Sequence, residues 1–317
     1  MVAAPLRIVF FGTPQFAVPT LRHLLASRHQ VVGVVTQPDR PRGRGHQVSD
    51  SPVKALALEH GIPIIQPERL KPPDVAATLR EWRPDLGVVA AYGRIIPEDL
   101  INLPRLGMIN VHASLLPKYR GAAPVHRAVI DGEPETGVTI MRLEKTLDTG
   151  PMFARVTRPI GPDETSDVVE RDLAELGASL LVTVVDQLAE GTAVEELQDF
   201  MTASYAPKVT REEGLLDWSL PAVYIHHRVR GLYPWPHAYS HLDGVRLILL
   251  KTRVESETAD AAPGTVVDVS RDAIHVATGH EGRIAILELQ AEGRRPLTVR
   301  DFLAGHPIRP GARFTAP

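Results

Sequence analysis

Short apolar runs alternate with amphipathic segments through the first 190 residues of the chain. The run from Leu6 to Phe11 is apolar apart from Arg7, and it leads through the turn Gly12-Thr13-Pro14 into a helix-like pattern. Similar strand-like runs follow at 31–35, 62–65, 86–91 and 108–111, with helix-like segments at 52–60 and 75–82. This alternation predicts an α/β domain with a Rossmann-like, mainly parallel sheet that helices cover on both faces.

The pattern changes after a long amphipathic helix, which we predict over residues 165–188 from a single apolar stripe. Residues 191–208 show no sustained helical or strand-like periodicity of apolar positions. Beyond them, after a short helix-like segment at 224–229, strand-like runs at 245–250, 264–269, 273–277 and 284–289 are separated by turns that contain glycine. These runs predict a smaller, OB-like antiparallel β-barrel. We therefore expect a first domain over 1–190, a linker over 191–208 and a second domain over 209–317.

Composition narrows the possible classes of protein. A chain of 317 residues is long enough for two domains with separate cores. The net charge of −3 gives no overall attraction to polyanions, so any nucleic-acid partner must bind a local patch. The absence of cysteine excludes disulfides, thiolate zinc sites and a cysteine nucleophile. No apolar stretch approaches the length of a membrane span or a secretory signal, so we expect a cytoplasmic protein with no membrane association.

The densest polar segment lies at 107–121, where a strand-like run ends in a loop. Asn110 and His112 are two residues apart and therefore lie on the same side of the strand. An imidazole transfers protons near neutral pH, and an asparagine amide donates to a developing oxyanion, so the pair suits acyl transfer without a metal. The spacing alone leaves open that both side chains merely satisfy backbone groups.

A carboxylate follows another predicted strand. Asp148 comes shortly after the apolar run 138–141, in the sequence Leu147-Asp-Thr-Gly150. It is suited to orient His112 and to hold a water molecule. An ordinary turn, with the Asp148 side chain bonded to Gly150, is the alternative that spacing does not exclude.

Several motifs, in this order and at this spacing, resemble the methionyl-tRNA formyltransferase family. In the first domain they are Phe11-Gly-Thr-Pro-Gln-Phe-Ala17, Thr36-Gln-Pro-Asp-Arg-Pro-Arg-Gly-Arg-Gly45, Asn110-Val-His-Ala-Ser-Leu-Leu-Pro117, Tyr119-Arg-Gly-Ala-Ala-Pro124, Glu135-Thr-Gly-Val-Thr139 and Leu147-Asp-Thr-Gly150. Asp217-Trp-Ser219 and Pro234-Trp-Pro236 resemble the start of the family's second domain, so the likeness covers nearly the whole chain. The segment 36–45 is what distinguishes this family from other folate-dependent formyltransferases.

The resemblance implies an enzyme of translation initiation that transfers the formyl group of 10-formyltetrahydrofolate to the amino group of methionyl initiator tRNA. It implies that Asn110, His112 and Asp148 are catalytic. It also implies a folate-binding loop made of Ser114, Leu115, Leu116 and Pro117. From their position after the run 86–91, we expect Tyr92, Arg94 and Ile95 to line the pterin pocket, although Ile95 suits a protein core equally well. We expect no metal, and a monomer.

Basic residues mark the expected contacts with tRNA. Arg40, Arg42 and Arg44 lie in a loop that follows the second strand, at the same sheet edge as the other site residues. The resemblance implies Arg44 in particular, although a plain solvated loop has the same composition. Residues 209–317 contain 13 acidic and 13 basic residues, so the expected tRNA-binding domain has no overall positive charge and a packing module is the alternative. We expect Trp235 to be a core or hinge residue.

Three other functions compete with this interpretation. A formyltransferase acting on an amino sugar nucleotide shares the catalytic motifs, but the basic loop argues against it. A dinucleotide oxidoreductase needs three glycines after the first strand, and only Gly12 is present. A non-catalytic tRNA-binding protein gives no reason for a histidine and an aspartate at two strand ends.

Overall fold

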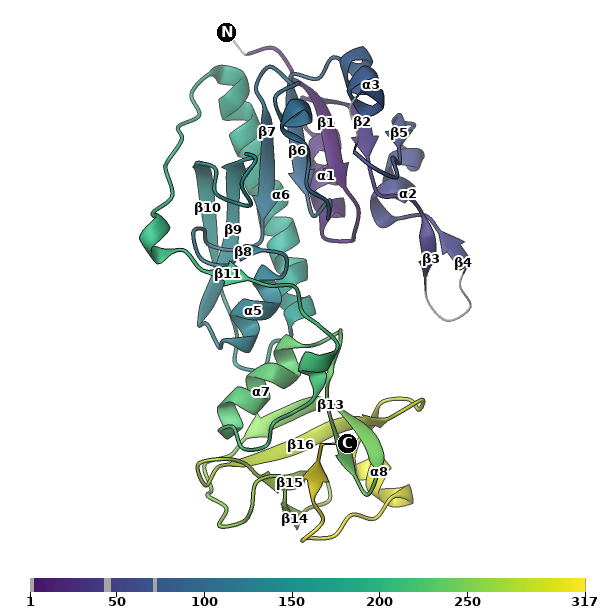
Figure 1. The fold of residues 1–317 in the computed structure, drawn as a ribbon, viewed down its shortest axis with the longest axis vertical. Coiled ribbons are helices and arrows are strands. Elements are labelled where there is room, and N and C mark those ends of the chain that lie inside the picture. Colours follow the sequence, from purple (N-terminus) through teal and green to yellow (C-terminus); the bar gives the residue numbers. More distant parts are fainter. Residues whose placement is uncertain (1–2, 43–46, 71–72, 317) are drawn as a thin grey trace. The chain divides into compact units, whose positions relative to one another are not determined.

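The computed structural model describes residues 3–42, 47–70 and 73–316. They form two compact units, which are described separately. The first consists of Met1–Pro124, Thr136–Arg158 and Glu170–Ala206, and the second of Val125–Glu135, Pro159–Val169 and Pro207–Pro317 (Figure 1). In the described part of the chain, no helix has the length and apolar character needed to cross a membrane.

The first unit is built on a seven-stranded sheet with the order β10-β9-β7-β6-β1-β2-β5. In this order, the neighbouring strands β7, β6, β1, β2 and β5 pair in parallel. Strand β9 runs antiparallel to β7. The predicted mainly parallel, Rossmann-like sheet is therefore confirmed. The bounds are β1 (Arg7–Gly12), β2 (Gln30–Val35), β5 (Ile64–Ile65), β6 (Leu86–Ala90), β7 (Met108–His112), β9 (Glu135–Arg142) and β10 (Met152–Pro159).

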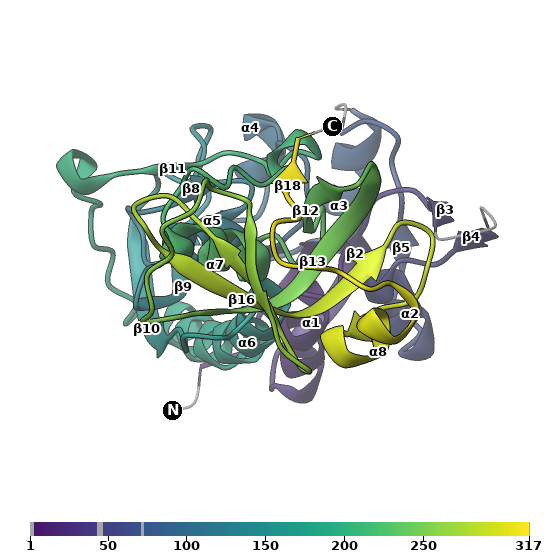
Figure 2. The ribbon, with the colours of Figure 1, turned by 90° about the horizontal axis from the view of Figure 1, so that it is seen from below.

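Helices cover both faces of this sheet. Figure 2 shows α1 (Ala17–Ala26) and α6 (Ser166–Glu190) on one face, with α3 (Asp74–Trp82) and α4 (Glu98–Ile101) on the other. Alternate residues of the central strands pack against α3 and α4 in one buried cluster. Because helices cover both faces of the sheet, these strands have continuous apolar runs in the sequence. Helix α2 (Pro52–Glu59) begins at Ser51, whose hydroxyl accepts from the Lys54 amide, with proline in the first turn.

The second unit is a small antiparallel barrel with the strand order β14-β15-β16-β13-β12-β18. An antiparallel bridge between Thr265 and Arg313 joins the two ends of this order and closes the sheet. The predicted OB-like barrel is confirmed. The bounds are α7 (Ala222–Gly231), β12 (Ala238–Leu242), β13 (Val245–Val254), β14 (Val266–Val269), β15 (Ile274–Ala277), β16 (Arg283–Ala291), β17 (Leu297–Thr298), α8 (Val299–Gly305) and β18 (Phe314–Thr315). Helix α5 (Pro124–Ile130) lies almost wholly in this unit.

Three further features complete the fold. Residues 191–206, which we call the strap, follow α6 and end in β11 (Tyr205–Ala206), which pairs with β8 (Arg120–Gly121) in the first unit (Figure 1). Strands β3 (Arg40–Arg42) and β4 (Gln47–Ser49) pair antiparallel. Trp235 is 53% exposed, so it is not a core residue, and the other expected role, at a hinge, stays a prediction.

Candidate active site

The carboxyl end of β7 presents Asn110 and His112 on one side of the sheet. His112 is 5% exposed and lies opposite Thr139 of β9, whereas Asn110 is half-buried. Parallel strands of such a sheet direct their carboxyl ends toward one edge, which is where ligands bind in this class of fold. The loops that follow β1, β2, β6 and β7 therefore share the edge that carries His112.

The two ring nitrogens of His112 have different partners. Nε2 lies 2.9 Å from the carbonyl oxygen of Tyr119. Because a carbonyl only accepts hydrogen bonds, Nε2 must carry a hydrogen. Nδ1, the other ring nitrogen, lies 3.7 Å from Oδ2 of Asp148 and so faces the carboxylate. His112 thus satisfies one backbone group, as the simpler interpretation held, and still presents a second nitrogen for chemistry.

Asp148 occupies the loop between β9 and β10 in an unusual backbone conformation. Its φ of 52° lies in the left-handed region, and its side chain is almost completely buried. The carboxylate accepts a hydrogen bond of 2.8 Å from the amide of Gly121. At Gly150 a Cβ atom would come within 2.1 Å of the Arg142 carbonyl oxygen, so the turn requires glycine there. The structure therefore brings together His112 and Asp148 from two distant segments.

The loop from Ser114 to Pro117 is fixed by hydrogen bonds to a neighbouring strand. Thr139 Oγ1 donates to the Ser114 carbonyl at 2.7 Å and accepts from the Leu116 amide at 3.1 Å. The side chains of Ser114 and Leu116 are buried, and Leu116 packs with two methionines. Leu115 and Pro117 are half-buried. Any contact that Ser114 and Leu116 make with a ligand is therefore a main-chain contact.

The three side chains that we expected to line the pterin pocket after β6 lie in different environments. Tyr92 is 2% exposed and packs on Phe11 in the core, and burial raises the pKa of its hydroxyl. Arg94 donates to the carbonyls of Pro67 and Glu68 at 2.9 and 2.7 Å, while Ile95 is 83% exposed and so is not a core residue. The side chain of Tyr92 is therefore in the core, that of Arg94 is bonded to the carbonyls of a neighbouring loop, and that of Ile95 is exposed.

The basic loop is only partly described. The backbones of Arg40 and Arg42 form β3, and Arg44 lies outside the described residues. Lys54, close to this hairpin in sequence, is engaged by the carboxylates of Asp39 and Asp50. The hydrogen bonds to these two carboxylates raise the pKa of Lys54.

Sequence reasoning did not assign roles to Thr139, Arg120 or Gln198, although all three contact the candidate site. Thr139 and Arg120 lie within motifs that the sequence shares with the family, so a closer reading of those motifs would have found them. Gln198 lies in the strap, where no period or motif marks it. Its burial depends on partners that are 48 to 78 residues away in the chain.

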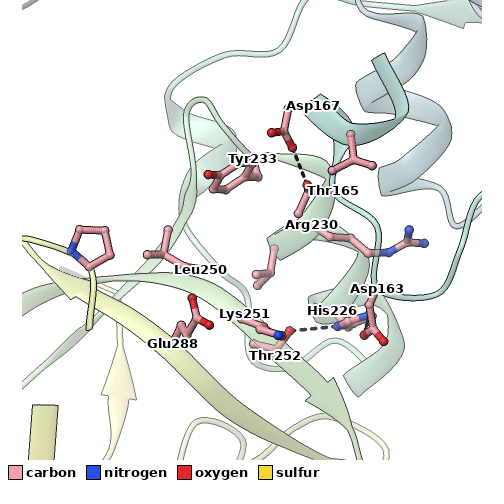
Figure 3. Close-up of a pocket in the computed structure, with 13 residues that line it drawn as sticks. Asp163, Thr165, Asp167, His226, Arg230, Tyr233, Leu250, Lys251, Thr252 and Glu288 are labelled. Atoms are coloured by element: carbon pink, nitrogen blue, oxygen red, sulfur yellow. Dashed lines mark hydrogen bonds and ion pairs between the residues drawn. The ribbon is translucent and has the colours of Figure 1, made fainter. Parts of the chain in front are cut away.

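A separate cavity of about 460 Å³ lies within the second unit (Figure 3). Its lining includes the carboxylates of Asp163, Asp167 and Glu288 together with the cations of Arg230 and Lys251. These groups carry charges of both signs, so the cavity shows no preference for one class of ligand. None of the residues that the sequence predicted for the site lines it. No cluster suited to hold a metal ion occurs among the residues that the structure describes.

Comparison with known proteins places the chain in a family. Residues 6–185 match the family model for formyl transferase, and residues 208–307 match the model for the formyl transferase C-terminal domain. The chain is 48% identical over 306 residues to methionyl-tRNA formyltransferase from Citrifermentans bemidjiense, covering 96% of this chain and 95% of that protein. It is 47% identical over 311 residues to methionyl-tRNA formyltransferase from Geobacter sulfurreducens, covering 98% and 97%.

Solved structures share the fold at low sequence identity. An N-formyltransferase from Helicobacter canadensis, in complex with folinic acid and dTDP-3-aminofucose, has a TM-score of 0.69 at 16% identity and covers 89% of this chain and 99% of its own. HypX from Aquifex aeolicus, in complex with tetrahydrofolic acid, has a TM-score of 0.64 at 17% identity and covers 98% and 51%. These structures show only the fold, whereas the two family models and the two relatives that are 47% and 48% identical show the family. The chain belongs to the formyl transferase family and, within it, to the methionyl-tRNA formyltransferases.

Proposed function

We propose that Asn110, His112 and Asp148 catalyse the transfer of a formyl group from 10-formyltetrahydrofolate to the amino group of methionyl initiator tRNA. The observation that carries this proposal is the approach of His112 Nδ1 to Asp148 Oδ2 at 3.7 Å, beside the end of β7. It occurs in a chain that is 48% identical to a methionyl-tRNA formyltransferase. The reaction is therefore a one-carbon transfer that supplies formylated methionine for translation initiation.

The chemistry requires stabilisation of charge on one oxygen. The methionyl nitrogen attacks the formyl carbon, a C–N bond forms, and negative charge develops on the formyl oxygen. The amide of Asn110 and the imidazolium of His112 supply hydrogen-bond donors for that charge. The bond between the formyl carbon and the folate nitrogen then breaks, the nucleophilic amine loses a proton and the leaving nitrogen accepts one.

Asp148 serves this chemistry through charge. Its carboxylate stabilises a positive charge on the imidazole, because the two groups are buried and only 3.7 Å apart. It is also placed to accept, by way of a water molecule, the proton that the attacking amine loses. No covalent bond between enzyme and formyl group is needed.

The residues present fit a folate co-substrate. The loop 114–117 is held by Thr139, so its main-chain groups are fixed before a ligand arrives. Leu115 and Pro117 supply partly exposed apolar surface at the same place. We retain Tyr92, Arg94 and Ile95 as part of the pterin pocket, with Tyr92 acting through its main chain because its side chain is buried.

We assign tRNA binding to the loop that contains Arg40, Arg42 and Arg44 and to the second domain. Guanidinium groups bind phosphate oxygens through paired hydrogen bonds, which suits an acceptor stem. The proposed organisation is a catalytic domain over 1–190, a linker over 191–208 and a tRNA-binding domain over 209–317. A cytoplasmic location and a monomeric state remain predictions.

A comparison of two acceptors, supplied in separate reactions, tests the function. Charged initiator tRNA and, separately, an amino sugar nucleotide are each supplied with 10-formyltetrahydrofolate, and the acylated product is identified by mass spectrometry. We expect formylmethionyl-tRNA only. Formylation of the sugar nucleotide with no formylated tRNA would replace this proposal with the amino sugar alternative.

A further inference from the structure

The strap buries a polar side chain and exposes its large apolar ones. Gln198 is 4% exposed, whereas Leu197 is 80% and Met201 is 92% exposed. Glutamine is seldom buried to this extent in proteins, and its burial is costly unless its polar atoms have partners. The position of Gln198 therefore depends on specific hydrogen bonds rather than on apolar burial.

All the polar atoms of the Gln198 side chain are hydrogen-bonded within the first unit. Oε1 accepts from Nε and Nη2 of Arg120 at 3.1 and 2.7 Å. Nε2 donates to the carbonyl oxygens of Asp148 and Gly150 at 2.9 and 2.8 Å. Because a guanidinium only donates and a carbonyl only accepts, the amide has a single possible orientation.

These bonds act on a part of the chain that has a left-handed backbone conformation. Asp148 has a positive φ of 52°, a conformation that few residues other than glycine adopt and that aspartate tolerates better than most, so contacts around it help to select it. Gln198 holds the peptide group that follows Asp148 and the one that follows Gly150. The direction in which the Asp148 side chain leaves the backbone is fixed with them.

Arg120, which is bonded to Gln198, also lies next to a residue that binds the Asp148 carboxylate. It precedes Gly121, whose amide donates to Asp148 Oδ2 at 2.8 Å. The Arg120 guanidinium also lies 4.7 Å from the ring centre of Phe200 in the strap. A Cβ atom at Gly121 would lie 2.6 Å from the Tyr205 ring, so glycine permits the close pairing of β8 with β11.

We propose that Gln198 is a positioning residue for catalysis, which holds the Asp148 carboxylate toward His112 through the Asp148 and Gly150 carbonyls. This inference rests on the proposed catalytic role of Asp148. Gln198 itself touches neither substrate in this scheme. Its removal therefore lowers kcat and leaves the KM of folate and of tRNA unchanged.

Two substitutions separate positioning from a structural tether. Gln198→Leu removes every hydrogen bond of the side chain. Gln198→Glu keeps the shape and the pairing with Arg120 but replaces the donor that faces two carbonyls by an acceptor. We expect both variants to lose about tenfold to a hundredfold in kcat, since small displacements of a catalytic group have effects of that size. Val194→Ala, at a strap residue that is 77% exposed, is the matched control with unchanged activity.

The decisive measurement is a double-mutant cycle with Asp148→Asn. If Gln198 acts through the carboxylate, Gln198→Leu has no further effect on kcat once Asp148 is asparagine. Thermal unfolding of each variant confirms that it is folded. Wild-type kcat in Gln198→Glu, or losses that multiply in the double variant, would overturn the positioning role alone. Wild-type kcat in Asp148→Asn would instead overturn the catalytic assignment, and the positioning role with it.

Discussion

The Nε2 atom of His112 is held 2.9 Å from the carbonyl oxygen of Tyr119. The imidazole is therefore fixed by a backbone group that comes seven residues later in the chain. This bond settles which nitrogen carries the permanent hydrogen and leaves Nδ1 for the side that faces Asp148. The loop from Ala113 to Tyr119 and the side chain of His112 therefore position each other. A change in the loop changes the orientation of the ring.

Replacement of His112 by alanine tests its catalytic role. We expect kcat to fall by about 10²-fold to 10⁴-fold, the usual contribution of a general acid or base. Folate affinity, measured by equilibrium dialysis with the unreactive 5-formyl compound, should change little because the loop 114–117 is held by Thr139. Turnover close to that of the wild type would remove His112 from the chemistry.

Asp148→Asn keeps the shape of the side chain and an oxygen that can accept from Gly121. It removes the negative charge that faces the imidazole at 3.7 Å. We expect an intact fold by circular dichroism and a formylation rate about 10²-fold lower or more. The reduction should extend over the whole accessible pH range. A normal pH–rate profile would contradict the assigned role.

Thr139→Val should loosen the folate loop. It removes the hydroxyl that bonds both Ser114 and Leu116, and leaves a buried carbonyl and a buried amide without that partner. We expect a loss of about 1–3 kcal/mol in the free energy of unfolding and a higher KM for folate. Thr139→Ser, which retains the hydroxyl, is the control. An unchanged folate KM in the valine variant would show that the loop does not depend on this anchor.

Arg44→Ala tests the basic loop, whose central residue lies outside the described structure. The KM for tRNA should rise, and the slope of its logarithm against the logarithm of salt concentration should fall by about one. The KM for folate should stay the same. Arg80→Ala, at an exposed position of α3, is the matched control. If the two variants bind tRNA equally well, the loop is only a solvated surface.

We expect the stability of the second unit to depend on pH because of His227. Burial, with smaller contributions from the charges of Arg230 and His226, lowers the pKa of His227 from 6.5 to about 4. Between these values the unfolded chain binds a proton that the folded chain does not, so stability falls as pH drops from 6.5 toward 4. His227→Gln should flatten this part of the unfolding profile. An NMR titration of the imidazole near 6.5 would disprove the shift.

Much of the fold could be predicted from periodicity. The buried strands of the parallel sheet and the barrel strands β13 to β16 appear as continuous or alternating apolar runs, because burial on one or both faces decides which residues are tolerated. Strand β10 was not predicted, since its outward face is partly exposed and its pattern is weak. Strands β8 and β11 contain two residues each, too few to show any period.

The residues of the candidate site differ in the same way: a local sequence pattern marks some of them and not others. Asn110 and His112 stand out because they interrupt the end of an apolar strand, and Asp148 because it lies in a glycine turn after another. Gln198 gives no such signal, since its burial is decided by Arg120, Asp148 and Gly150 rather than by its neighbours in sequence. The exposure of Trp235 was unpredictable for the same reason, because no local pattern reports which long-range contacts a large side chain finds.

The bridge between Thr265 and Arg313 has a consequence for the behaviour of the second unit during synthesis and storage. Residues 311–315 fill the gap between β14 and β12, so until they are in place both strands have free backbone donors and acceptors. Free edges of this kind pair with other chains. A variant that lacks these few residues should therefore form oligomers and precipitate, even though every residue of the first unit is intact.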